Sequence, residues 1–129
     1  MQQDILADAL SAVKNARNTG KGECTISPTS GLIKDVLKVL QDKGYIGVFE
    51  EIEDGKGGKF KVEVKNRLNE CNAVKPRFYV DKDEYRKYEE RHLPARDFGE
   101  LIVTTPEGVM DHREARERGV GGALLAYVY

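Results

Sequence analysis

The chain has 129 residues, of which 40% are hydrophobic and 33% are charged, with a formal net charge of −1. This length suits one domain or two small lobes with a shared core, and the absence of any run of about 18 apolar residues argues against a membrane span. No basic segment followed by an apolar one begins the chain, so we expect a cytoplasmic protein. The near-neutral charge argues mildly against nucleic-acid binding, because such proteins are usually basic.

Residues 4–18 are predicted to form the first helix, because Leu6, Leu10 and Val13 recur at helical spacing. A short strand at residues 23–27 follows. The pattern therefore begins with a helix and then a strand.

The second helix is predicted to start at Thr29 or Ser30, either of which can serve as the N-cap, and to close at Gly44. Residues 45–53 and 59–65 then predict two strands joined by a turn, since apolar and charged side chains alternate along the second. The first 66 residues therefore predict an α-β-α-β-β lobe.

The second lobe, residues 67–129, is predicted to be mainly β. Residues 74–80 should be extended, and the charged segment 81–92 is predicted to be a solvated helical insertion. Residues 101–104 form an apolar strand that should end in a turn at 105–108.

A short helix is predicted after this turn, with Asp111 as its N-cap, Glu114 in a position typical of a capping box, and Gly119 at its end. Residues 123–129 should form the closing strand. The predicted fold class is therefore α+β, with an N-terminal α-β-α-β-β lobe packed on a mainly antiparallel β C-terminal lobe that carries a short helix.

The sequence contains no G-x-x-x-x-G-K-[ST] loop, G-x-S-x-G elbow or H-E-x-x-H helix. The nearest approach to an acid–base constellation consists of four residues close to the predicted turn: Asp97, Glu100, Asp111 and His112. An Asp-His pair at a helix start is explained more simply by N-capping. Cys24 and Cys71 lie far apart without a C-x-x-C motif, so buried thiols are expected rather than a zinc site. We therefore expect that the protein is not an enzyme and that it binds no cofactor, metal or small-molecule substrate.

The C-terminal lobe instead concentrates groups suited to contacting a polymer. Threonine hydroxyls both donate and accept hydrogen bonds, glycines allow a close backbone approach, and cations can neutralise phosphates. These groups are Thr104, Thr105, Gly108, Gly121, Gly122, Lys75, Arg77 and Arg116. Each of them alone also has a purely structural explanation, such as β-propensity for the threonines or a bend for the glycines.

The run GELIVTTPEGVM at residues 99–110, followed by Ala115-Arg116 and Gly121-Gly122, resembles the C-terminal signature of the small-subunit ribosomal protein S8 family. The resemblance extends to LADAL at 6–10, to Pro28-Thr29-Ser30 and to KPRF at 75–78, and so covers nearly the whole chain. The segment LPARDFG at 93–99 and the charged insertion before it are similar to the archaeal and eukaryotic branch.

This resemblance implies a monomeric protein that binds the central domain of small-subunit rRNA early in assembly, beside neighbouring ribosomal proteins. Thr104 and Thr105 would contact bases and sugars. Gly108 would shape their turn, while Pro106 stands where the family often has a hydroxyl and would stiffen the turn or remove one contact. Gly121 and Gly122 would allow close approach, and Lys75, Arg77 and Arg116 would meet phosphates. A secondary contact would come from the N-terminal lobe through Asn15, Thr29, Ser30 and Lys34.

The alternative is a small α+β protein-interaction module, or an uncharacterised enzyme, without RNA affinity. The location of the cations separates the two hypotheses. RNA binding needs Lys75, Arg77 and Arg116 on the same side as Thr104, whereas the alternative predicts a neutral edge or a pocket elsewhere.

Overall fold

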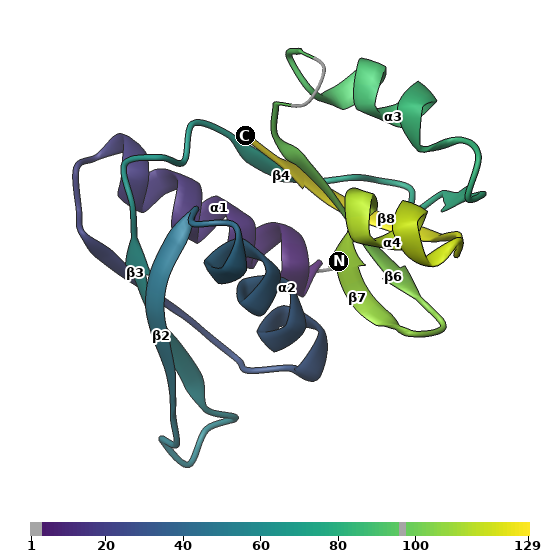
Figure 1. The fold of residues 1–129 in the computed structure, drawn as a ribbon. Helices are drawn as coiled ribbons and strands as arrows, with labels where there is room; N and C mark the ends of the chain where they lie inside the picture. Colours follow the sequence, from purple (N-terminus) through teal and green to yellow (C-terminus); the bar gives the residue numbers. More distant parts are fainter. Residues whose placement is uncertain (1–3, 96–97) are drawn as a thin grey trace. The chain divides into compact units, whose positions relative to one another are not determined.

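The computed structural model describes residues 4–95 and 98–129 (Figure 1). These residues form two compact units, Met1–Cys71 and Asn72–Tyr129. The sequence pattern suggested a division after Asn66. The structure keeps the following segment with the first unit, because Leu68 is buried there and the Cys71 thiol donates a hydrogen bond to the Leu10 carbonyl, with 3.4 Å between the sulfur and oxygen.

The first unit contains, in chain order, α1 (Ile5–Asn18), β1 (Glu23–Ile26), α2 (Gly31–Asp42), β2 (Ile46–Ile52) and β3 (Lys59–Val64). This order confirms the predicted α-β-α-β-β pattern. The strands form an antiparallel sheet in the order β1-β3-β2, and both helices pack against it (Figure 1).

Local capping sets where both helices begin. The Asp4 carboxylate accepts hydrogen bonds from the backbone N–H groups of Leu6 and Ala7, which starts α1. The Ser30 hydroxyl accepts from Ile33 N–H at 3.1 Å, so Ser30 rather than Thr29 is the N-cap of α2.

The second unit is built from β4 (Cys71–Ala73), β5 (Tyr79–Val80), α3 (Tyr85–His92), β6 (Glu100–Thr105), β7 (Gly108–Asp111), α4 (His112–Arg118) and β8 (Gly122–Val128). The sheet order is β4-β8-β6-β7, and β5 pairs with the start of β8. The α+β class and the mainly antiparallel second lobe are thereby confirmed.

Two details of the second unit correct the sequence-based prediction. The turn predicted at residues 105–108 is present, but it leads into a strand that was not predicted, β7 (Gly108–Asp111), which pairs with β6 before the helix begins. With only four residues, β7 is too short for its alternation to be recognised. The charged segment 81–92 forms a helix only from Tyr85 onward, and that helix is not simply solvated.

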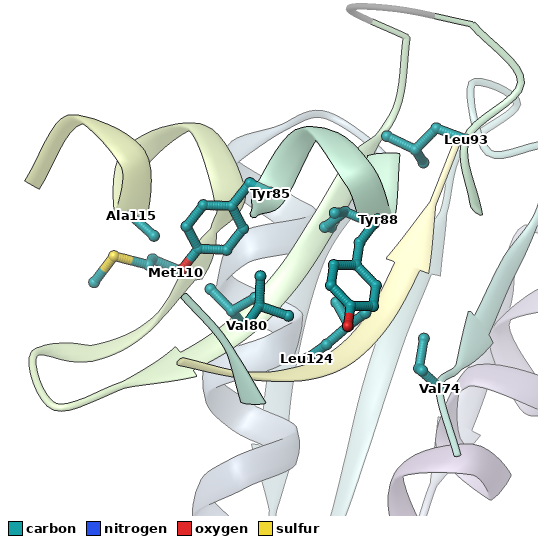
Figure 2. Close-up of a cluster of buried hydrophobic side chains, with 10 residues drawn as sticks. Val74, Val80, Tyr85, Tyr88, Leu93, Met110, Ala115 and Leu124 are labelled. Atoms are coloured by element: carbon teal, nitrogen blue, oxygen red, sulfur yellow. The ribbon is translucent and has the colours of Figure 1, made fainter. Parts of the chain in front are cut away.

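The helix α3 contributes two tyrosines to the core of the second unit. Tyr85 and Tyr88 have exposed fractions of 1% and 8%, and both point from α3 toward the sheet, where Val80 and Leu124 lie (Figure 2). Ala115 of α4 belongs to the same cluster. The two helices thus cover one face of this sheet, and most of their charged side chains are exposed, although Glu89 of α3 is only 12% exposed.

Within the ranges 4–95 and 98–129, no helix has the length and apolar character needed to cross a bilayer.

We predict that Gly122→Ala destabilises the second unit. A Cβ atom on Gly122 would overlap the Thr104 carbonyl oxygen and would lie 2.9 Å from the Thr105 methyl carbon. Overpacking of this kind typically costs about 1–3 kcal/mol of unfolding free energy, measurable by urea titration. The matched control is Gly31→Ala, where a Cβ atom meets nothing within 4 Å. Equal stabilities of the two variants would contradict the prediction.

Candidate nucleic-acid interface

A row of four neighbouring side chains lies across the sheet of the second unit, close to the β6–β7 turn. Thr104 is opposite Ala123 of β8 on one side and Val109 of β7 on the other, and Ala123 is opposite Tyr79 of β5. Residues directly opposed in antiparallel strands project from the same face. Tyr79 is 65% exposed, and the other three are partly exposed. We call this set, Tyr79, Ala123, Thr104 and Val109, the open row.

The two threonines of the signature lie on opposite faces of β6, because side chains alternate along a strand. Thr104 belongs to the open row. Thr105 is only 9% exposed, and its hydroxyl donates to the Gly108 carbonyl at 2.9 Å and accepts from Glu107 N–H at 3.0 Å. The Thr105 hydroxyl therefore closes the turn, and contact between it and a ligand stays a prediction.

The glycines near the turn have different structural reasons. Gly108 has a positive φ of 119° and open space around it, which fits the predicted turn-shaping role. A Cβ atom on Gly121 would lie 2.6 Å from the Val80 carbonyl oxygen, and one on Gly122 would overlap the Thr104 carbonyl. Gly121 and Gly122 therefore allow the strands of this unit to approach one another, which is a different reason from approach to a ligand.

The cations expected near the threonines do not all lie on one face. Arg77 comes two residues before Tyr79, in an exposed segment that runs beside β8, since Leu124 N–H donates to the Phe78 carbonyl at 2.8 Å. Lys75 is exposed in the same segment. Arg116 is on α4, which packs on the face opposite the open row. The expectation that all three cations share the face of Thr104 is therefore wrong for Arg116, which lies on the helical side, while Lys75 and Arg77 belong to the exposed segment that leads into Tyr79.

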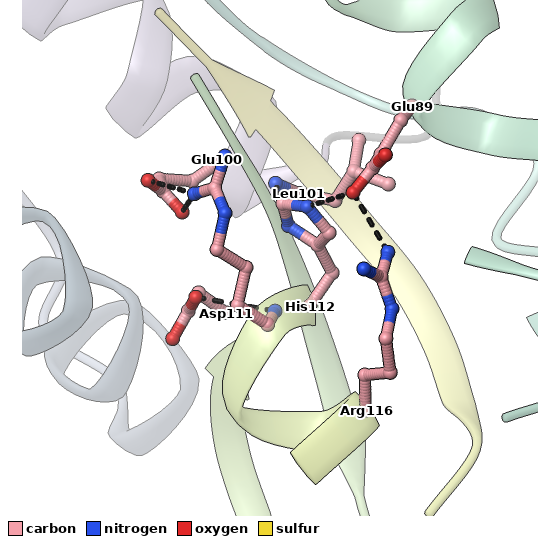
Figure 3. Close-up of polar contacts among 7 residues, drawn as sticks. Glu89, Glu100, Leu101, Asp111, His112 and Arg116 are labelled. Carbon is pink, nitrogen blue, oxygen red and sulfur yellow. Dashed lines mark hydrogen bonds and ion pairs between the residues drawn. The ribbon is translucent and has the colours of Figure 1, made fainter. Parts of the chain in front are cut away.

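Arg116 is held by a polar network that links α3 to α4 (Figure 3). Its Nη2 lies 2.8 Å from Glu89 Oε1, and the same carboxylate oxygen lies 2.5 Å from His112 Nε2. On the other side of the His112 ring, Nδ1 accepts a hydrogen bond from Leu101 N–H at 3.0 Å. The bond to Nδ1 fixes the tautomer, so Nε2 carries the proton and donates it toward Glu89.

Burial controls the protonation of this network. The pKa of His112 is lowered from its ordinary value, chiefly because the buried ring is desolvated, although Glu89 acts in the opposite direction. The pKa of Glu89 is also lowered: burial would raise it, but the nearby His112 and Arg116 outweigh that effect. At neutral pH the network is a carboxylate that bridges a neutral imidazole and a guanidinium.

Glu100, Asp111 and His112 bring their ligand atoms within 4.8 Å of one another, and all three are buried. Each already has another partner. Arg113 binds both carboxylate oxygens of Glu100, Asp111 accepts from Arg113 N–H as the N-cap of α4, and both ring nitrogens of His112 face the groups described above. The cluster is best explained as a structural network, which confirms the capping role predicted for Asp111. Asp97 lies outside the described residues.

The cysteines have the properties of thiols that are not activated for chemistry. Burial raises the pKa of Cys71 to about 12 and that of Cys24 to about 11.

The four N-terminal candidates are distributed over two helices. Thr29 and Ser30 stand at the start of α2, where Ser30 caps the helix and the Thr29 hydroxyl donates to the Gly57 carbonyl at 2.8 Å. Lys34, one turn further on, is paired with Glu51 at 3.8 Å. Asn15 is exposed on α1, in a shallow groove that Thr19 and Thr25 also line.

Tyr79 was missed by the sequence analysis. The signal was present, because a tyrosine directly after the KPRF motif and before a buried valine fits an alternating strand with an outward-facing aromatic. That signal was weak, since β5 is only two residues long.

We predict that the second unit loses stability as the pH falls. Because the pKa of His112 is lowered in the folded state, the unfolded chain binds the proton first, so unfolding free energy is greatest above about pH 6.5 and decreases below it. His92, whose pKa burial also lowers, acts in the same direction, and Glu89 adds a further loss below its ordinary value of 4.5. Urea titrations from pH 8 to 4 measure the profile.

His112→Asn is the test variant, since its amide oxygen can still accept from Leu101 N–H. Its stability should change less between about pH 6.5 and 5 than that of the original chain. An NMR titration of the original chain should place the pKa of His112 below 6.5. A His112 that titrates above that value would contradict the assignment.

Comparison with known proteins identifies the family of this chain. The family model described as ribosomal protein S8 matches residues 4–129. A protein of Methanococcoides burtonii named small ribosomal subunit protein uS8 is 56% identical over 126 residues, which cover 98% of this chain and 97% of that protein. Proteins of the same name from Halorubrum lacusprofundi and Natronomonas pharaonis are 53% and 55% identical, with the same coverage.

These relatives come from archaea, which confirms the predicted archaeal-type branch, and they carry the name of a ribosomal protein rather than of an enzyme. The match extends over both units and includes the signature around the β6–β7 turn. The chain therefore belongs to the ribosomal protein S8 family.

Proposed function

We propose that this protein is a constituent of the small ribosomal subunit that binds the central domain of small-subunit rRNA directly and supports subunit assembly. The name shared by its relatives, small ribosomal subunit protein uS8, supports the first part. The observation that carries RNA binding is the open row, which presents an exposed aromatic ring and a hydroxyl on one face of the sheet, with Ala123 between them, and has Arg77 two residues before Tyr79 in the sequence.

The chemistry of the open row suits unpaired RNA bases. A tyrosine ring such as that of Tyr79 can stack on a splayed base, and the Thr104 hydroxyl can donate to or accept from a base edge or a 2′-hydroxyl. Ala123 lies between Tyr79 and Thr104, and its small side chain projects little from the sheet. A flat base can therefore approach both the ring and the hydroxyl. An irregular helix with splayed bases is therefore the form of RNA that this surface fits.

The remaining candidates have supporting roles in this proposal. Lys75 and Arg77 neutralise phosphates next to the row. Thr105, Pro106 and Gly108 give the β6–β7 turn its shape and stiffness, and Arg116 contacts the RNA backbone from the helical side. Gly121 and Gly122 have no side chains, so they let the neighbouring strands pack closely at the start of β8.

The first unit supplies a secondary contact. Asn15 and Lys34 offer exposed polar atoms to the RNA, while the hydroxyls of Thr29 and Ser30 are already engaged in holding the start of α2 and the neighbouring hairpin tip. The contribution of Thr29 and Ser30 is therefore to position the loop backbone.

The overall charge of −1 is compatible with RNA binding when affinity depends on stacking and hydrogen bonds more than on net charge. A modest dependence of affinity on salt follows. The isolated protein is a monomer in this proposal, and within the cytoplasmic ribosome its other partners are neighbouring small-subunit proteins.

Tyr79→Ala should weaken binding to an rRNA fragment of the central domain by about 1–3 kcal/mol, because the stacking surface is lost. Tyr79→Phe is the matched control and should retain most of the affinity, since it keeps the ring. Calorimetric or filter-binding titration measures both. Equal affinities of the alanine variant and the original chain would reject the open row as the binding surface.

Thr104→Val should cost about 1 kcal/mol of binding free energy, because it removes one hydroxyl and keeps the β-branched shape. The loss should be greater for the specific rRNA fragment than for an unrelated RNA duplex. A similar loss with both RNAs would assign Thr104 a structural role only.

A further inference from the structure

A basic depression lies between the start of α3 and the outer side of α4. It has a volume of about 340 Å³ and is lined by Lys82, Asp83, Tyr85, Arg86 and Arg116. We propose that this depression binds a phosphate group of the RNA backbone, at a site separate from the open row. The inference rests on the proposed RNA-binding function and extends it to the helical side of the second unit.

The charge of the lining supports an anionic ligand. The cations Lys82, Arg86 and Arg116 surround the depression, with Asp83 as the opposing acid in the lining, although the whole chain carries a formal charge of −1. Lys82 and Arg86 are exposed, so a ligand reaches them without rearrangement of the fold. Three cations and one acid thus line the depression, so its lining is positively charged.

Arg116 is oriented toward this role by its contact with Glu89. The Arg116 atom in this contact is Nη2, which lies 2.8 Å from Glu89 Oε1 (Figure 3). A guanidinium carries five N–H donors in a planar arrangement. Its side chain remains 44% exposed despite this ion pair. Glu89 is itself anchored by His112, so it restricts the position of Arg116 and leaves other donors available to an oxygen-rich ligand.

The wall of the depression is rigid. The ring of Tyr85 is buried in the core of the second unit, and its hydroxyl donates to the Val120 carbonyl at 2.8 Å. Val120 directly precedes Gly121 and Gly122. The hydrogen bond between Tyr85 and Val120 therefore connects the depression to the edge of the sheet at the start of β8, next to Ala123 of the open row. A single RNA segment bound at that edge can thus extend toward the depression, which favours RNA over an acidic protein as the source of the anion.

The test is a comparison of three variants of the full chain, each of which removes one positive charge. Lys82→Gln and Arg86→Gln remove cations of the depression. Lys87→Gln is the matched control, because Lys87 follows Arg86 on α3 but its ammonium group lies over the Tyr88 ring, 5.6 Å from the centroid. All three side chains are exposed, so the variants should keep the fold, which thermal unfolding verifies.

Affinity is measured for the central-domain rRNA fragment and for an unrelated RNA duplex at several salt concentrations. Loss of one phosphate contact should weaken binding roughly three- to tenfold at 0.1 M salt and reduce the slope of log K against log[salt] by about one. We expect this result for Lys82→Gln and Arg86→Gln with both RNAs, because phosphate contacts carry no sequence information. Lys87→Gln should have the affinity and slope of the original chain.

Three results would overturn the proposal. If Lys82→Gln and Arg86→Gln behave like Lys87→Gln while the original chain binds rRNA, the depression is not a phosphate site and the proposed function stands. Weaker binding with an unchanged salt slope would also exclude a phosphate contact. If the original chain fails to select the rRNA fragment over the unrelated duplex at moderate salt, the proposed function fails, and the inference that rests on it fails too.

Discussion

The close approach of β6 and β8 at Gly122 is the constraint on which the candidate interface depends. A Cβ atom at this position would overlap the Thr104 carbonyl, so any other residue would force the two strands apart there. That register places Thr104 opposite Ala123, and Ala123 in turn lies opposite Tyr79. A buried glycine thus supports the strand pairing that brings these side chains together at the surface.

The helical side of the second unit follows a different physical rule. Burial of Tyr85 and Tyr88 attaches α3 to the sheet, and this brings Glu89 to His112 and Arg116 of α4. The Glu89 carboxylate lies between the neutral His112 ring and the Arg116 guanidinium. Protonation of His112 at low pH therefore adds positive charge where α3 and α4 meet. Glu89 is one of the acidic residues that make the net charge of the chain slightly negative, and its role is to link the two helices.

The distribution of charge matters more than its sum. Acidic side chains engage neighbouring cations at several points, as in the pairs Arg113–Glu100 and Arg118–Glu107. The cations around the depression are opposed there by fewer acids. Membership of the ribosomal protein S8 family and a net charge of −1 are therefore compatible, because a polyanion responds to the local field near its phosphates.

The sequence by itself determined the features that depend on nearby residues: the order of elements in the first unit, the Asp111 cap, the end of α4 at Gly119, and the family signature. Only the tertiary structure decided which face of β6 Thr104 occupies, that Tyr79 is exposed on the same face with Ala123 between the two, and that Arg116 pairs with Glu89, 27 residues away. The physical reason is range. Caps and periodicity act within a few residues, whereas strand register and ion pairing between helices join distant segments that local patterns do not connect.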